Sequence, residues 1–257
     1  MSGETNAIGP IWLASIRDLQ WRSRRFLLAV LATGLVFGLA LMMSGVANSF
    51  AVEIQDTVSA LGAPLWFVPT GSPGPFTIAA PFPVSTAAAI RQVPGVTAAN
   101  PILVSRALTG GAISSSDRSG ASPSSERDVN VIGVVPDGVG SPRVVEGAPV
   151  RQGNSVVADE SLGAKIGQEI ALNGTRFKVV GLVHGDTYFA GVPVVFVTLQ
   201  AADRFTVDGA PLATAVLVRG RPTRPVAGFT ALTDAQVRSD LGRPTIQAAQ
   251  TLSLIHI

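Results

Sequence analysis

The fold is decided at residues 155–183, SVVADESLGAKIGQEIALNGTRFKVVGLV. Apolar residues alternate on both sides of Asn173-Gly174, a dipeptide that favours a two-residue β-hairpin turn. Before the hairpin comes a strand, and then a short helix, DESLGAKI, with Asp159 as its N-cap and Gly167 where a left-handed exit would fall. The stretch therefore predicts a strand, a short helix, and a hairpin of two further strands.

The flanking sequence repeats this mixture of short strands and single helices. Runs rich in β-branched residues predict strands at 65–68, 102–108, 129–135, 192–197 and 214–218. Helices are expected at 84–93, capped by Ser85 or Thr86 and stopped by Pro94-Gly95, at 199–205, and at 231–251 with Thr233 as N-cap and a bend at Pro244. Residues 114–128, SSSDRSGASPSSERD, are polar and low in complexity, which favours a loop. These elements predict an α+β domain with a mixed or antiparallel sheet.

Residues 26–47, FLLAVLATGLVFGLALMMSGVA, form an apolar run with no charge. About 20 apolar residues in a helix span a hydrocarbon core of about 30 Å, so the run predicts a transmembrane helix. Arg22, Arg24 and Arg25 stand just before it. Because Lys and Arg resist translocation, residues 1–25 are expected to be a cytoplasmic amphipathic segment, with the chain from residue 48 outside. The alternative is a signal peptide cleaved near Ala51, although the run is longer than a typical signal core.

Within the apolar run, Gly34 and Gly38 form a GxxxG pattern. Small side chains allow a second helix to approach closely, so the pattern is consistent with packing against a partner helix. The alternative is that glycine is simply frequent in membrane helices.

Two further helices frame the expected extracytoplasmic domain, residues 48–251. Residues 52–61 continue the helical pattern beyond the membrane until Pro64, and the helix at 231–251 runs back toward a membrane. We expect both to act as stalks. Residues 252–257, LSLIHI, are the translation of CTGTCTCTTATACACATC, a string that matches a common transposon-based sequencing adapter, so this tail is expected to be non-native; the alternative is a native apolar terminus.

The search for chemistry gives no strong candidate. The chain has no cysteine, which excludes thiolate catalysis and cysteine-ligated zinc, and it contains no P-loop, GxSxG or HExxH motif. No run of Lys and Arg with interleaved aromatics supports nucleic-acid binding. His184 and Asp186 lie in a glycine-flanked segment, yet no serine is singled out as their nucleophile. Asp159-Glu160 fits a helix N-terminus. We therefore expect no catalytic residue, no cofactor and no metal site.

These features resemble the ABC-transporter permeases of the MacB/FtsX type, in particular their periplasmic core domain. The resemblance rests on SRRFLLAVL (23–31), VIGVVPDGV (131–139), VVEGAPV (144–150) and, above all, residues 155–183. One departure is Gly167-Gln168, where the family usually has Gly-Asp. The three C-terminal membrane helices of the family are absent, which is consistent with truncation.

The resemblance implies a permease subunit that pairs with a cytoplasmic ABC ATPase, dimerises, and performs no chemistry itself. Its stalk helices would convert closure of the ATPase into motion of the outer domain, for export or extraction of a substrate. Arg22, Arg24 and Arg25 would set the orientation of the chain in the membrane. Their second role would be to contact the ATPase. Two other hypotheses stay open: a single-pass anchored ligand-binding or sensor module, and a secreted hydrolase.

Overall fold

The computed structural model describes residues 23–76, 80–113, 126–188, 191–205 and 209–241. Its contacts divide the chain into two units, Met1–Ser49 and Phe50–Ile257, and each unit is described by itself. The predictions for residues 1–22, 114–125 and 242–257, including Arg22, the polar loop, the bend at Pro244 and the tail, lie outside the described residues.

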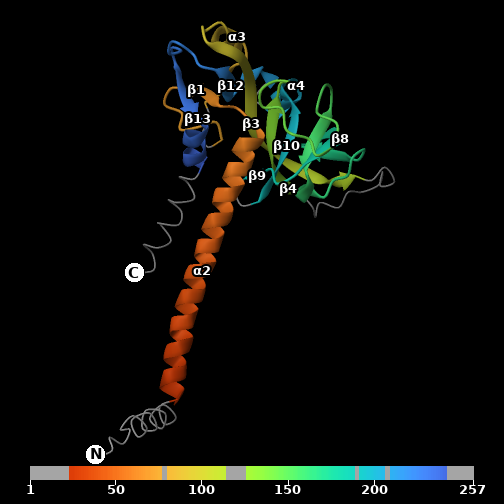
Figure 1. The fold of residues 1–257 in the computed structure, drawn as a ribbon. Coiled ribbons are helices and arrows are strands. Elements are labelled where there is room, and N and C mark those ends of the chain that lie inside the picture. Colours follow the sequence, from red (N-terminus) through yellow and green to blue (C-terminus); the bar gives the residue numbers. More distant parts are fainter. Residues whose placement is uncertain (1–22, 77–79, 114–125, 189–190, 206–208, 242–257) are drawn as a thin grey trace, which may run out of the picture. The chain divides into compact units, whose positions relative to one another are not determined.

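The first unit contains most of helix α2, which runs over Ser23–Ala60 as a single helix (Figure 1). Its apolar side chains are exposed, with Leu35 at 75% and Leu41 at 73% of their maximum. Among the described residues, Arg24–Ala60 is the one helix long and apolar enough to cross a membrane, with a mean hydropathy of 2.5 in its most apolar window. A solvent-exposed apolar surface of this length is costly in water, so it requires lipid or protein around it.

The C-terminal end of α2 lies in the second unit and differs slightly from the prediction. The helix ends at Ala60, and Gly62 adopts a left-handed conformation (φ +55°) with its N–H donating to the Ser59 carbonyl (3.0 Å). Glycine takes this conformation without a Cβ clash, so it stops the helix before Pro64 does.

The second unit is built on a large mixed sheet. Its described strands are β1 (Leu65–Pro69), β3 (Val96–Ile113), β4 (Arg127–Val134), β5 (Glu146–Gly147), β6 (Ser155–Asp159), β7 (Glu169–Leu172), β8 (Thr175–Val183), β9 (Thr187–Tyr188), β10 (Val192–Thr198), β12 (Ala215–Gly220) and β13 (Phe229–Thr233). The order is β13-β1-β12-β3-β4-β10-β6-β8-β5, and β2 (Phe82–Pro83) and β11 (Leu212–Ala213) form a separate small pair. The α+β class with a mixed sheet is therefore confirmed.

Strand β3 belongs to two parts of this sheet. Its first half pairs with β12, up to Ile102, and its second half pairs with β4, from Leu103 to Thr109. From Thr109 on it also pairs with β7, which in turn pairs with β8. Because β4 pairs with β10, β10 with β6, and β6 with β8, the strands β3, β4, β10, β6, β8 and β7 form a closed ring.

Buried side chains fill both sides of the sheet. The ring encloses one cluster, which includes Leu103, Val131 and Phe177. A second cluster lies on the other face of β4 and β10 and continues over β1 and β12 to α2, with Trp66 fully buried in it. Helix α3 (Thr86–Arg91) covers the opposite face of β1 and β12 through Ile90. Because successive side chains of a strand point to opposite faces, the same strands contribute to clusters on both faces of the sheet.

Within residues 155–183 the hairpin is confirmed and the helix is corrected. Asn173 and Gly174 both have positive φ (+45° and +80°), as a tight hairpin turn requires. Asp159 is the N-cap, but the expected helix is one 3₁₀ turn, Glu160–Leu162, that ends at Gly163 (φ +73°). The first glycine able to adopt the left-handed conformation ended it, four residues before Gly167.

Elsewhere the elements are found with changed bounds. The strand expected at 102–108 is the much longer β3, and the helix expected from 231 begins at 234 because residues 231–233 belong to β13. Ser85 occupies the N-cap of α3 without a side-chain cap bond. Helix α4 (Leu199–Ala202) and the 3₁₀ turn Asp203–Phe205 match the helix expected at 199–205.

Phe177→Ala should destabilise the ring strongly, because Phe177 is fully buried within it. Removing a buried phenylalanine costs about 3–5 kcal/mol of unfolding free energy. Urea denaturation of the detergent-solubilised chain measures this. The control is Lys178→Ala on the same strand, whose exposed side chain should matter by less than about 0.5 kcal/mol. Equal effects of the two changes would contradict the ring interior described above.

Candidate functional site at the junction of two helices

The last turns of α2 and the helix at 234–241 meet in one buried cluster. Val58 and Leu61 of α2 lie in the same hydrophobic cluster as Val237 and Leu241 of the second helix. All four side chains are less than 5% exposed. Two helices more than 170 residues apart in the chain therefore share a core beneath β1.

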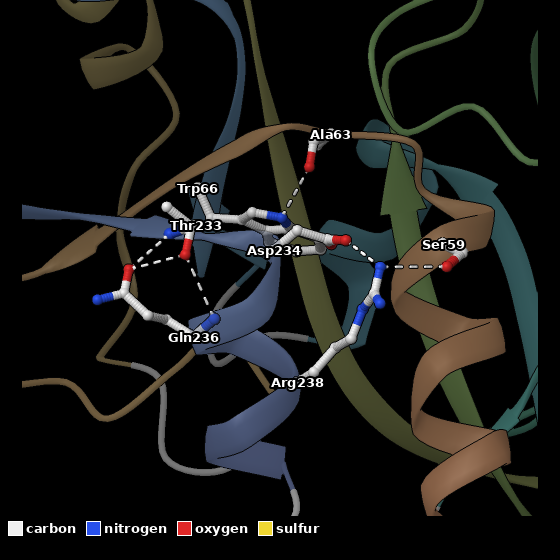
Figure 2. Close-up of polar contacts among 7 residues, drawn as sticks. All are labelled: Ser59, Ala63, Trp66, Thr233, Asp234, Gln236 and Arg238. Carbon is white, nitrogen blue, oxygen red and sulfur yellow. Dashed lines mark hydrogen bonds and ion pairs between the residues drawn. The ribbon is translucent and has the colours of Figure 1, made fainter.

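Trp66 on β1 is the central side chain of this junction. It is fully buried, and its indole N–H donates to the carbonyl of Ala63 just after α2 (3.2 Å; Figure 2). Its ring contacts Phe76 (centroids 5.7 Å apart), and Phe76 in turn meets Tyr188 edge-on (5.5 Å). Burial of the phenol raises the pKa of Tyr188, so it remains a neutral member of this aromatic row.

A capping box fixes the start of the second helix. The N–H of Gln236 donates to Oγ1 of Thr233 (3.4 Å), and the N–H of Thr233 donates to Oε1 of Gln236 (2.8 Å; Figure 2). These reciprocal bonds satisfy two backbone donors that the helix itself cannot. The predicted N-cap at Thr233 is confirmed, and the sharp strand-to-helix change at residue 234 follows from it.

Arg238 joins the two helices through polar contacts. Its guanidinium donates to the carboxylate of Asp234 one turn earlier and to Oγ of Ser59 on α2 (3.5 Å; Figure 2). Its Nε is buried and has no hydrogen-bond partner among the described residues. The side chain is about one-third exposed, so the bonds to Asp234 and Ser59 lie partly shielded from water.

Gly74 lets the second helix approach the loop after β1. Asp240 is 5% exposed, and a Cβ added at Gly74 would overlap its carboxylate. A larger residue at 74 would force the Asp240 carboxylate to move from its present position. The backbone conformation of Gly74 is open to other residues, so glycine is needed here for space next to Asp240 and not for backbone freedom.

The α2 end also contacts a segment on its other side, residues 184–188, which we name the docking segment. Oγ1 of Thr57 donates to the carbonyl of Thr187 (2.7 Å). Nearby, the N–H of Gly191 donates to Oε1 of Glu53 (2.6 Å). Thr57 is 1% exposed, so this contact is dry.

His184 and Asp186, noted from the sequence, lie in the docking segment but do not form a catalytic pair. Nδ1 of exposed His184 lies 2.9 Å from Oε2 of Glu160, and this hydrogen bond and the Glu160 charge raise the pKa of His184. Burial of Asp186, and then the Asp159 charge, raise the pKa of its carboxyl to about 7. Asp159 accepts from the N–H of Ser161 (2.9 Å) and of Asp186 (2.8 Å), so it has a structural role beyond capping.

Comparison with known proteins identifies the family. The model of the MacB-like periplasmic core domain matches residues 26–236. The chain belongs to the MacB-like family of ABC transporter permeases. A permease of Mycobacterium tuberculosis (strain ATCC 25618 / H37Rv), the uncharacterized ABC transporter permease Rv0072, is 32% identical over 244 residues, 95% of this chain and 67% of that protein. The uncharacterized ABC transporter permease Mb2592 of Mycobacterium bovis (strain ATCC BAA-935 / AF2122/97) is 30% identical over 244 residues, which again cover 95% of this chain and 67% of that protein.

Two solved structures are also similar to the permease. The periplasmic region of MacB from Actinobacillus actinomycetemcomitans matches 72% of this chain and 96% of that one, at 12% identity and a TM-score of 0.46. The extracellular domain of the noncanonic ABC-type transporter YknZ from Gram-positive bacteria matches 63% of this chain and 84% of that one, at 15% identity and a TM-score of 0.43.

The family membership makes the permease a membrane-located transporter component and implies an ATPase partner. The arginines and glycines singled out from the sequence for topology and helix packing all lie in its first unit. Arg24 and Arg25 are exposed in the first turns of α2, and Gly34 and Gly38 have nothing within 4 Å of an added Cβ. Their roles stay predictions.

Arg238→Gln should loosen the junction, because it removes the charged donor shared by Asp234 and Ser59. Losing such a bond costs about 1 kcal/mol, equivalent to a roughly fivefold drop in amide protection of residues 50–61 and 234–241. Hydrogen-exchange mass spectrometry measures it. Arg151→Gln is the matched control, since its ion pair with Asp137 is about two-thirds exposed and should contribute nothing measurable. If amide protection is unchanged in Arg238→Gln, Arg238 does not stabilise the contact between the two helices.

Proposed function

We propose that the permease couples ATP hydrolysis by a separate or fused cytoplasmic ATPase to motion of its second unit outside the cell, for export or extraction of a substrate. The observation that carries this is the continuity of α2. One helix contains the apolar span at 26–47 and also the buried Val58 at its other end. Helical backbone bonds are satisfied internally, so a helix transmits displacement as a rod.

The junction gives this rod a fixed attachment. Val58 is fully buried against the aromatic row, and Ser59 is bonded to Arg238. A displacement of α2 would therefore act on the core of the domain through Val58 and would shift α2 against the helix at 234–241, at the Ser59–Arg238 bond. That helix is the proposed second stalk, and the core domain at 48–251 is the proposed moving part.

The orientation and the assembly belong to the same proposal. Arg22, Arg24 and Arg25 would hold residues 1–25 in the cytoplasm, where they can also contact the ATPase. Gly34 and Gly38 would allow a second membrane helix, from a homodimer or a permease pair, to approach α2 within the lipid.

Cysteine labelling tests the orientation, and the chain has no native cysteine to interfere. Lys178→Cys lies on an exposed side chain of β8 and should react with a membrane-impermeant maleimide in intact cells. Ser2→Cys should react only after permeabilisation. Changing Arg22, Arg24 and Arg25 to glutamine should let a fraction of the chains invert, because the positive charges that oppose translocation are gone. Labelling of Ser2→Cys in intact cells would contradict the orientation.

Cross-linking tests the coupling. In a complex with its ATPase, cysteines at Ser59 and Arg238 joined by a cleavable bifunctional maleimide should lower ATP turnover at least severalfold, because the two helices can no longer shift relative to each other. Cleaving the linker should restore turnover.

The matched control joins cysteines at Glu169 and Lys178, which pair across the β7–β8 hairpin. That link lies within one rigid element and should leave turnover unchanged. Full turnover with the Ser59–Arg238 link in place would count against mechanical coupling and favour an anchored binding module.

A further inference from the structure

The docking segment is held from two sides. On one side Thr57 of α2 donates to the Thr187 carbonyl, in a contact where Thr57 is 1% exposed. On the other side Asn130 of β4, fully buried, donates from Nδ2 to the carbonyl of Tyr188 (3.2 Å). The segment is therefore hydrogen-bonded to α2 on one side and to the sheet on the other. Any shift of the segment changes the surface against which α2 packs.

Asp186 lies at the centre of this clamped segment. Its N–H donates to Oδ2 of Asp159 (2.8 Å), and its carbonyl accepts from the N–H of Val194 (2.9 Å). The residue is 6% exposed. Among the described residues its carboxyl oxygens receive no hydrogen bond and no ion pair, although its backbone is fixed on both sides. A largely buried carboxylate without a protein donor is disfavoured as the charged form.

The charged groups facing Asp186 add to this cost. Asp159 faces it from β6 and Asp56 faces it from α2, and both are acidic. His184, two residues earlier, is the one opposing group, and its imidazole is engaged by Glu160. Ionisation of Asp186 would thus add a negative charge that is repelled by the acidic side chains of Asp56 on α2 and Asp159 on the sheet.

We propose that the contact between the last turns of α2 and the docking segment is a proton-dependent latch, closed while Asp186 is a neutral acid and loosened when it ionises. Loosening removes the Thr57–Thr187 bond and frees the end of α2 from one of its attachments, leaving the Arg238 junction and the bond between Gly191 and Glu53. The latch itself does not require the proposed function. Its consequence does: if α2 moves during transport, proton binding regulates how firmly α2 is held.

The direction of the pH dependence follows from linkage. Burial, with the Asp159 and Asp56 charges, raises the pKa of Asp186 to about 7 in the closed state, above its ordinary 3.8. Between these two values the closed state binds more protons than the open state, so opening becomes easier as pH rises. Above about pH 7 both states are ionised and the dependence ends.

Hydrogen exchange of the purified full chain in lipid nanodiscs, without ATPase, tests the latch. After correction for intrinsic exchange, protection in peptides covering residues 53–61 and 183–188 should fall about tenfold or more from pH 5 to pH 7 and then level off. Asp186→Asn, which has the shape of the neutral acid, should show flat protection over this range. Asp128→Asn, an exposed acid on β4, is the matched control and should keep the wild-type profile.

Asp56→Asn provides a second variant that leaves Asp186 in place. Removing the charge on α2 should make the fall with pH smaller, because less repulsion opposes ionisation. The latch is overturned if Asp186→Asn retains the wild-type pH dependence, if Asp56→Asn leaves the profile unchanged, or if wild-type protection does not vary. Because no ATPase is present, these outcomes are independent of the cross-linking result, and either proposal can fail alone.

Discussion

The second unit depends on strand β3, because its 18 residues take part in two sheet regions that would otherwise be separate. Up to Ile102 it extends the open part with β12, β1 and β13, and from Leu103 it closes the ring through β4 and β7. The α2 junction is built on the open part, whereas the docking segment follows β8 of the ring. Continuity of one backbone therefore keeps both attachments of α2 in register.

Much of the fold follows from local chemistry that is visible in the sequence. Asn173-Gly174 requires a tight turn, Thr233 caps a helix, and the uncharged run at 26–47 requires a helix that is not surrounded by water. Each signal involves residues close together in the chain. The length of β3 and the ring closure could not be predicted, because they depend on pairings such as Thr109 with Leu172, whose registers no local pattern encodes.

The junction was predicted only in part, for the same reason. Helices at both ends of the domain were expected, but nothing in the sequence indicates that Ser59 lies beside Arg238 or that Gly74 makes room for Asp240. The hydrogen bond between His184 and Glu160 could not be predicted either. Asp186 is nearer to His184 in the sequence and was therefore the expected partner. The buried polar groups are recognisable only after the sheet has brought distant segments together.

The ring also bears on how relatives diverge. Strands β3 and β4 are paired as far as Thr109 and Arg127. In the sequence, the polar stretch 114–125 connects the end of β3 to the start of β4. Because those ends are already held together, lengthening the connection costs entropy that grows only with the logarithm of its length. Changes in the length or composition of this stretch should therefore cost the ring little stability.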